Sequence, residues 1–247
     1  MSELHQPDAA EQGGEPRVPA DPPWGVAAGL AVVVAYLLVQ QLLGALTPDR
    51  RDPASVMAVL TVGGLLFLLL VRVLLRTCGG AGSSPHRLIG LVPPGRAGLR
   101  RAVAPILLGA LAYAGVAIGW GLVLQRLHNG PIPEQPVIGS IRGARSAPAI
   151  VLALIGGALV APTVEEVLLR GMLYLPLRRA LGVGWAAVLV SLVFALVHFY
   201  GWGLPQFFVL SLIFVALFER TGTLLAPIAA HAAFNAVQII MVLKGWM

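Results

Sequence analysis

The chain has 247 residues, of which 57% are hydrophobic and 11% are charged, and its mean hydropathy is +0.85. A soluble domain carries about 25% charged residues, so this composition excludes an ordinary water-soluble protein and indicates a membrane protein. The net charge of +6 does not indicate a nucleic-acid-binding protein, because the arginines lie between apolar runs and not on a solvated domain.

The chain begins with a polar segment and continues as a series of apolar runs. Residues 1–23 are acidic and rich in proline, which predicts a disordered tail. Roughly 20 apolar residues span the hydrocarbon core of a bilayer as a helix. We therefore expect seven spans, at 24–46, 54–76, 102–126, 148–178, 184–200, 204–218 and 223–243. The predicted fold class is all-α, a polytopic transmembrane helical bundle of about seven spans.

The arginines between the spans predict the orientation of the protein in the membrane. Several of them surround the loop at 77–101, and positive charge marks the cytoplasmic side. The N-terminal tail then lies in the cytoplasm, and the loop at 49–52 lies outside. Three arginines at 126–145 fall on the outer side and speak against this arrangement. We expect a multi-pass protein of the cell membrane with a cytoplasmic N-terminus.

Few polar groups interrupt the second half of the chain. After residue 140 the acids and histidines are Glu165, Glu166, His198, Glu219 and His231, and Asn235 follows one turn later. A charge at the centre of a spanning helix costs about 2.5–3.5 kcal/mol, so such residues usually face the bundle interior and mark function. They predict an intramembrane polar cavity. Glu219 is the exception, because it stands in a polar turn (FERTGT) where we expect a solvated charge.

The two adjacent glutamates differ in their local partners. Residues four apart share a helix face, so Glu166 can pair with Arg170. Glu165 has no partner within its own turn, and in an apolar site its pKa would be raised unless a cation or metal lay nearby, which suits a general base or acid. A structural alternative is a capping box of Thr163 and Glu166 that starts a helix. The long fourth span is then either tilted, or kinked or broken at Pro162.

The two histidines lie on other spans. His198 stands in FALVHFYGW, whose aromatic residues also fit an interfacial belt. His231 and Asn235 share one helix face, where a structural hydrogen bond between helices is the alternative. At 1.5 Å per residue, Glu165, His198 and His231 lie roughly 20, 21 and 12 Å from the inner ends of their helices. The three helices can therefore meet near the middle of the membrane.

These side chains suit hydrolysis of an amide in two ways. Glu165, His198 and His231 could hold a zinc ion and leave one position open for water. Alternatively, Glu165 and His198 hold and deprotonate a water directly, while His231 and Asn235 donate to the oxyanion. The spacing leaves both schemes open. A thiol mechanism is disfavoured, because the lone cysteine, Cys78, is remote from these residues.

Three ordered motifs carry a resemblance to a known family. EEVLLR (165–170), FALVH (194–198) and HAAFN (231–235) resemble the EExxxR, FxxxH and HxxxN/D motifs of the CPBP family. These are the CAAX-protease and bacteriocin-processing intramembrane proteases, which are related to the Rce1-type prenyl-protein endopeptidases. The resemblance covers about 148–243, which it marks as the catalytic helical core behind three N-terminal transmembrane helices at 24–126.

The resemblance implies a role for each matching residue. Glu165 would activate water beside His198, and His231 and Asn235 would form the oxyanion side. The residues that would shape the site are Glu166, Arg170 and Phe194. Members of the family are called metalloproteases, although a metal-free glutamate mechanism has been argued for some of them.

The expected partners are the lipid bilayer and a peptide or membrane-protein substrate, with no nucleic acid, and the sequence leaves the oligomeric state open. Two other functions fit the same residues. Buried Glu and His side chains also form proton relays, as in a proton-coupled transporter or ion conductor. A non-catalytic membrane scaffold or immunity protein is the second alternative.

Overall fold

The computed structural model describes residues 17–47, 52–79 and 84–246. Helices dominate this part of the chain, and it contains no strand. Residues 1–16 of the predicted tail and residues 49–51 of the predicted outer loop lie outside the described residues. Residues 17–23 have no helix but lie against the bundle, because Arg179 donates to the carbonyl oxygen of Pro22 at 3.2 Å.

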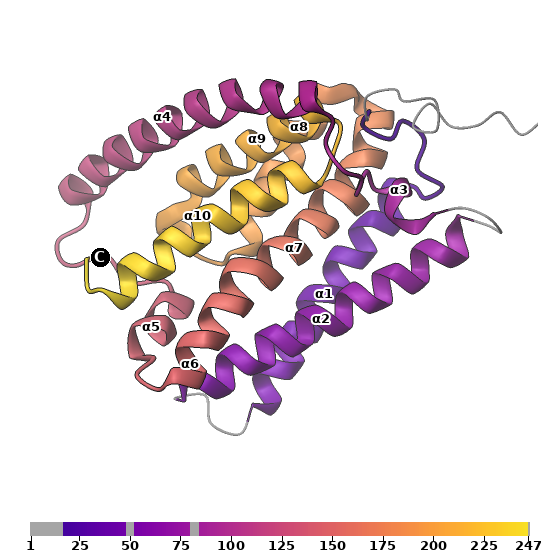
Figure 1. Ribbon diagram of the computed structural model, residues 1–247. Coiled ribbons are helices and arrows are strands. Elements are labelled where there is room, and N and C mark those ends of the chain that lie inside the picture. Colours follow the sequence, from indigo (N-terminus) through magenta and orange to yellow (C-terminus); the bar gives the residue numbers. More distant parts are fainter. Residues whose placement is uncertain (1–16, 48–51, 80–83, 247) are drawn as a thin grey trace, which may run out of the picture.

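Two N-terminal helices, α1 (Val26–Leu46) and α2 (Pro53–Cys78), run side by side (Figure 1). Asp52 caps α2, since its carboxylate accepts from the backbone N–H groups of Ala54 and Ser55 and from the Ser55 hydroxyl. These hydrogen bonds, above all the one from the Ser55 hydroxyl, lower the pKa of Asp52. The cap therefore fixes the start of a helix whose sides are almost wholly apolar.

The next segment covers one side of the bundle. A short helix, α3 (Pro85–Leu88), leads to α4 (Arg96–Leu127), which packs along α9 (Leu204–Thr221). Close approach of the two helices is possible because Gly109 faces the side chain of Ile213. A second short helix, α5 (Pro136–Gly143), then leads back towards the start of α2.

A long helical segment crosses the middle of the molecule, and two parts of it are π-helical. It consists of α6 (Ala147–Leu152), the π-helical η1 (Ala153–Val160), α7 (Ala161–Glu166), the π-helical η2 (Val167–Tyr174) and α8 (Leu175–Val197). In Figure 1, α7 lies between α10 (Leu225–Leu243) and the α1–α2 pair, and it contacts both. The site glutamates are thus on the most central helix.

The structural alternative, a capping box at Thr163, is wrong. The helix does not start there: Val160 has helical dihedral angles, and the hydroxyl of Thr163 donates to the carbonyl oxygen of Leu159 one turn earlier. The chain also stays helical through Pro162 and is not broken there. A π-helical turn directly before a proline relieves the loss of its N–H, because the backbone bonds are already re-spaced.

Six helices of the described residues are long and apolar enough to cross a membrane. The fourth, Ala147–Val197, has 51 residues and covers the predicted span 148–178 and most of the predicted span 184–200. They are separated at Gly182, whose φ of 77° and ψ of 169° are not helical. The segments on either side pack together as neighbours, because α8 contacts η2. The all-α, polytopic bundle predicted from the sequence is confirmed.

The outside of the bundle is apolar, as a bilayer requires. Leu107, Leu108 and Leu111 of α4 are among many large aliphatic side chains that are exposed. The core lies around η2, α8 and α9, and includes Tyr174, Phe214 and Phe218. A short 3₁₀ turn, η3 (Gly201–Gly203), joins α8 to α9 near one end of that core.

Candidate active site

Glu165 and Glu166 lie on α7 and face different surroundings. The Glu166 side chain is completely buried, whereas 25% of the Glu165 side chain is exposed, and Glu165 lines a cavity. Neighbouring positions on a helix differ by about 100° in direction, so the two carboxylates diverge. Of the two carboxylates, therefore, the one that a molecule in the cavity can reach is that of Glu165.

Glu166 is held by an ion pair within the bundle. Arg170 donates from Nη1 to Glu166 Oε1 at 3.1 Å, as the i, i+4 spacing predicts, and the side chains of both residues are fully buried. The Arg170 Nη2 group donates to Ser211 on α9, to its Oγ at 2.6 Å and its carbonyl oxygen at 3.0 Å. The guanidinium also lies 5.1 Å from the ring centre of Phe194 and 5.5 Å from that of Phe214.

His231 bridges the two glutamates from α10. Its Nδ1 lies 3.0 Å from Glu166 Oε1, and its Nε2 lies 3.7 Å from Glu165 Oε2. The ring stacks on Phe214, with centroids 4.5 Å apart and an interplanar angle of 24°. Since Glu166 is already paired with Arg170, its carboxylate accepts, and the Nδ1–H of His231 is the donor.

His198 reaches Glu165 from the end of α8. Its Nε2 lies 3.9 Å from Glu165 Oε2, and its Nδ1 lies 2.7 Å from the carbonyl oxygen of Phe194. A carbonyl oxygen only accepts, so Nδ1 carries the proton and Nε2 points its lone pair at Glu165. The next residue, Phe199, has a φ of +49° and turns outward, where it is 73% exposed. Phe199 thus faces away, while the imidazole of His198 and the side chains of Tyr200 and Trp202 face the cavity.

The meeting point of these groups has room for a small molecule. The separations of 3.7 and 3.9 Å between Glu165 and the two histidines are too long for hydrogen bonds. Glu165 Oε2 is nevertheless buried and has no hydrogen-bond partner among the described residues. A water can connect two polar groups whose direct separation exceeds about 3.5 Å. A water that donates to Glu165 Oε2 satisfies this oxygen.

The fit of a metal ion can be tested on the same atoms. A carboxylate oxygen and two imidazole nitrogens are a suitable donor set for zinc, and the Nδ1–H bonds of both histidines would orient them. However, zinc–ligand bonds of 2.0–2.2 Å place tetrahedral donors about 3.3 Å apart, which is less than the separations between Glu165 and the histidines. Across the described residues, no group of three or more His, Cys, Asp or Glu side chains is placed to hold a metal.

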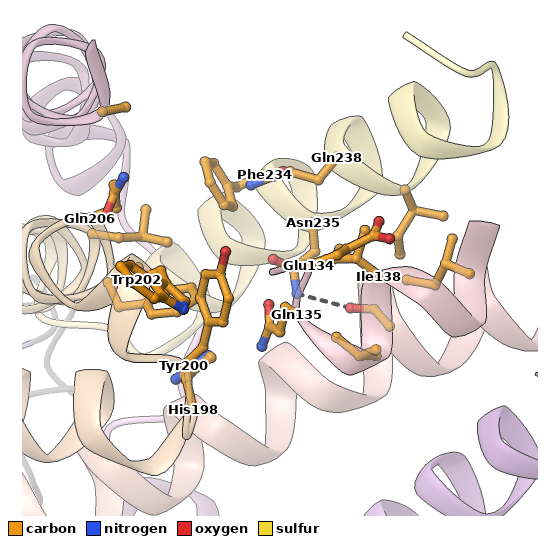
Figure 2. Close-up of a pocket in the computed structure, with 18 of the residues that line it drawn as sticks. Glu134, Gln135, Ile138, His198, Tyr200, Trp202, Gln206, Phe234, Asn235 and Gln238 are labelled. Atoms are coloured by element: carbon orange, nitrogen blue, oxygen red, sulfur yellow. Dashed lines mark hydrogen bonds between the residues drawn. The ribbon is translucent and has the colours of Figure 1, made fainter. Parts of the chain in front are cut away.

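Asn235 lies at the edge of the site and makes a hydrogen bond between helices. Its Nδ2 donates to the carbonyl oxygen of Gly157 in η1 at 2.9 Å, the bond marked in Figure 2. In the π register, Ala161 donates to Gly156, so residue 162 would donate to Gly157. Pro162 has no N–H, and Asn235 supplies the missing donor. Its amide has a second N–H, and the residue lines the cavity.

The cavity has a volume of about 730 Å³ and is walled mainly by apolar and aromatic side chains from α4, α5 and α8–α10. Figure 2 shows Gln206, Phe234, Gln238 and Tyr200 around it. At its rim, Arg142 pairs with Glu134 at 2.8 Å. The Tyr200 hydroxyl donates to the carbonyl oxygen of Pro133 at 2.8 Å, and burial, with a smaller contribution from Glu134, raises its pKa.

The structure corrects the sequence-based prediction for Glu219 and adds one residue, Ser211, that the sequence did not indicate. Glu219 is not simply a solvated charge, because it accepts from Tyr174 at 2.8 Å and pairs with Arg178 at 2.7 Å. Ser211 was missed as a neighbour of the site. An uncharged residue in an apolar run gives no sequence signal, and only the packing of α9 against η2 and α8 reveals its role.

Together, the fold and the site define a polytopic membrane protein whose bundle encloses a glutamate and two histidines in one cavity. Residues 147–237 match the model of the Rce1-like family, described as type II CAAX prenyl endopeptidases. This match confirms the family resemblance over the part of the chain that carries the site, and it supports a CAAX-type intramembrane endopeptidase as the general class of activity. No curated protein and no solved structure gives a significant match.

Proposed function

We propose that this protein is an intramembrane endopeptidase in which Glu165, aided by His198, activates the hydrolytic water. The observation that carries the proposal is the convergence of three side chains from separate helices. The Nε2 atoms of His198 and His231 lie 3.9 and 3.7 Å from the same oxygen of Glu165, inside a cavity. A site that faced lipid, or histidines far from Glu165, would not support hydrolysis.

The proposed reaction begins with a water held between Glu165 and His198. Glu165 takes a proton from this water, and the oxygen of the water attacks the carbonyl carbon of the scissile peptide bond. The carbonyl oxygen becomes an oxyanion in a tetrahedral intermediate. The proton then passes from Glu165 to the peptide nitrogen, the C–N bond breaks, and a carboxylic acid and an amine leave the site while Glu165 is again a carboxylate.

His231 and Asn235 are the proposed donors to the oxyanion. Asn235 has one amide N–H left after its bond to Gly157. For His231 the hydrogen-bond pattern sets a condition: its Nδ1–H points at Glu166, so it donates from Nε2 only as an imidazolium. The carboxylates of Glu165 and Glu166 lie on the two sides of the ring.

The walls of the cavity favour an apolar substrate segment in an extended or unwound form. Leu124, Phe207 and Phe234 represent its many apolar and aromatic side chains, and Glu134 and Arg142 at the rim neutralise each other. A charged residue inside such a cavity would lose its hydration without a partner. We therefore propose a peptide or membrane-protein substrate whose cleaved segment is uncharged.

The proposal is tested with purified protein in lipid nanodiscs and quenched-fluorescent peptides built from an uncharged, apolar sequence. Replacement of Glu165 by Gln should reduce cleavage roughly 10²- to 10⁴-fold, the contribution typical of a general base. Asp52→Asn, at the start of α2, is the matched carboxylate control and should cleave like the wild type. Cleavage that is equal in Glu165→Gln and wild type would refute the mechanism.

The same cleavage assay with a chelator tests whether the reaction needs a metal ion. We expect cleavage to survive treatment with 1,10-phenanthroline, because the donor atoms are too widely spaced for a zinc ion. Loss of cleavage that added zinc restores would instead make Glu165, His198 and His231 the ligands, after closing by several tenths of an ångström. Proton flux into liposomes without peptide cleavage would favour the transporter alternative. A cellular phenotype that is unchanged in Glu165→Ala would favour the scaffold alternative.

We further propose that the protein lies in the cell membrane and that its N-terminus faces the cytoplasm. This orientation is supported by exposed arginines gathered at one end of the bundle. They are Arg72, Arg76, Arg87, Arg96, Arg100, Arg101, Arg179 and Arg220. Leu224 donates to the carbonyl oxygen of Gly90 at 2.8 Å, which joins the loop after α3 to the end of α9.

A further inference from the structure

We propose that Ser211 on α9 is a positioning residue for His231 and acts through Arg170 and Glu166; this inference rests on the proposed function of the site. Ser211 lies outside the three motifs that carry the family resemblance. It touches neither the cavity nor Glu165, so any effect on the reaction passes through the fully buried ion pair.

The contacts of Arg170 show what Ser211 does. Both acceptors of Ser211, its Oγ at 2.6 Å and its carbonyl oxygen at 3.0 Å, bind the same Nη2 group. Arg170 is left with a single contact to Glu166, from Nη1 to Oε1 at 3.1 Å. Arg170 Nε and Glu166 Oε2 are buried without hydrogen-bond partners among the described residues. The pair is thus monodentate, although arginine and carboxylate groups prefer a bidentate geometry.

The monodentate geometry matters because Glu166 Oε1 also binds His231. The same oxygen lies 3.1 Å from Arg170 Nη1 and 3.0 Å from His231 Nδ1. Without the hydroxyl of Ser211, Nη2 keeps only the backbone carbonyl oxygen of residue 211, so the guanidinium is held less firmly and can turn towards both oxygens of Glu166. It would then compete with His231 for Oε1. Ser211 therefore keeps one side of Glu166 available to orient the imidazole.

A second residue of α9, Phe214, contacts both Arg170 and His231. Phe214 lies one turn after Ser211, stacks on the His231 ring at 4.5 Å and lies 5.5 Å from the Arg170 guanidinium. Ser211 and Phe214 thus lie on one face of α9. Ser211 positions the Arg170–Glu166 ion pair, and Phe214 fixes the plane of the His231 ring. The position of α9 sets the direction in which His231 Nε2 points.

The test compares two buried serines on neighbouring helices. Ser211→Ala should reduce kcat roughly ten- to hundredfold with little change in KM, since it removes a hydrogen bond to a charged group without touching the substrate. Ser191→Ala is the matched control: Ser191 on α8 is equally buried, and its Oγ has no hydrogen-bond partner in the described part of the chain. This variant should cleave the apolar peptide like the wild type.

Nuclear magnetic resonance of ¹⁵N-histidine-labelled protein gives a readout that needs no cleavage. The downfield Nδ1 proton of His231, assigned by its loss in His231→Asn, should shift or broaden in Ser211→Ala and stay unchanged in Ser191→Ala. Ser211→Thr, which keeps a hydroxyl, should restore both the signal and kcat, and it serves if Ser211→Ala does not fold. In a protein that already carries Glu166→Gln, Ser211→Ala should reduce kcat little further, because both substitutions interrupt the same series of contacts from Ser211 to His231.

The outcomes separate the two proposals. If Ser211→Ala and Ser191→Ala leave the Nδ1 signal equally unchanged, the positioning role is wrong, whatever the protein cleaves. If the wild type cleaves no peptide but the signal responds to Ser211→Ala alone, the positioning contact stands and the proposed function fails. Equal losses of kcat in Ser211→Ala and Ser211→Thr would also overturn the role of the hydroxyl.

Discussion

At the residue scale, the molecule assigns different tasks to two neighbouring glutamates. Glu166 is completely buried and is neutralised by Arg170, whereas Glu165 faces a cavity and has the imidazoles of His198 and His231 within 4 Å. A buried ion pair contributes little net stability, because desolvation opposes the attraction of its charges. The ion pair instead fixes the position of Glu166 Oε1, which binds His231 Nδ1.

Removal of one partner of this pair should destabilise the protein strongly. Arg170→Gln leaves the Glu166 carboxylate buried without a cation, and an uncompensated buried charge costs about 3–5 kcal/mol. Thermal or denaturant unfolding in detergent micelles measures the loss. The double variant Glu166→Gln with Arg170→Gln should be more stable than Arg170→Gln alone. If the two variants unfold alike, the cost does not come from the unpaired charge.

At the scale of elements, close packing of backbones fixes α1 against the central segment. Gly29 of α1 lies against the carbonyl oxygen of Met172 in η2, where an added Cβ would overlap this oxygen. The indole N–H of Trp24 donates to the same carbonyl at 2.9 Å. Without a hydrophobic driving force between helices in lipid, such close approach is a main source of association.

Gly29→Ala should therefore destabilise the bundle, by roughly 1–3 kcal/mol as expected for overpacking against a backbone atom that cannot move aside. Gly115→Ala on α4 is the control, because a Cβ there meets nothing within 4 Å. Alanine favours a helix over glycine, so this control should be neutral or slightly stabilising. Unfolding in detergent measures both variants, and equal stability of the two would contradict the packing argument.

At the scale of the whole molecule, the two ends of the bundle differ. One end carries the exposed arginines and the end of α2, where Cys78 is exposed. The other carries α5 and the rim of the cavity with Glu134 and Arg142. The start of α2 lies at this second end, since Gly143 of α5 approaches Pro53. Lys and Arg in short loops mark the cytoplasmic side.

This asymmetry predicts which cysteine a membrane-impermeant maleimide reaches. In intact cells, Cys78 should stay unlabelled and should react only after the membrane is permeabilised. The control is Cys78→Ser combined with Glu134→Cys, which moves the thiol to the exposed rim and should react in intact cells. The reverse pattern would show that the arginine-rich end faces outward and that the cavity rim faces the cytoplasm.

The sequence determined the class of structure and the identity of the central residues. Long apolar runs require helices in a bilayer, because every backbone N–H and C=O must be satisfied within its own segment. The rarity of polar residues in these runs then singled out Glu165, His198 and His231, since a charge in lipid persists only where something uses it. The pairing of Glu166 with Arg170 followed from helix periodicity alone.

Only the tertiary structure decided how these residues are arranged. Periodicity is a local property, so it could not show that His231 contacts both glutamates or that Ser211 holds Arg170. It also suggested a cap at Thr163, where packing keeps the segment helical through Pro162 and Asn235 replaces the missing backbone donor. Contacts between distant segments depend on how helices pack against one another, and the sequence pattern of a single helix does not predict them.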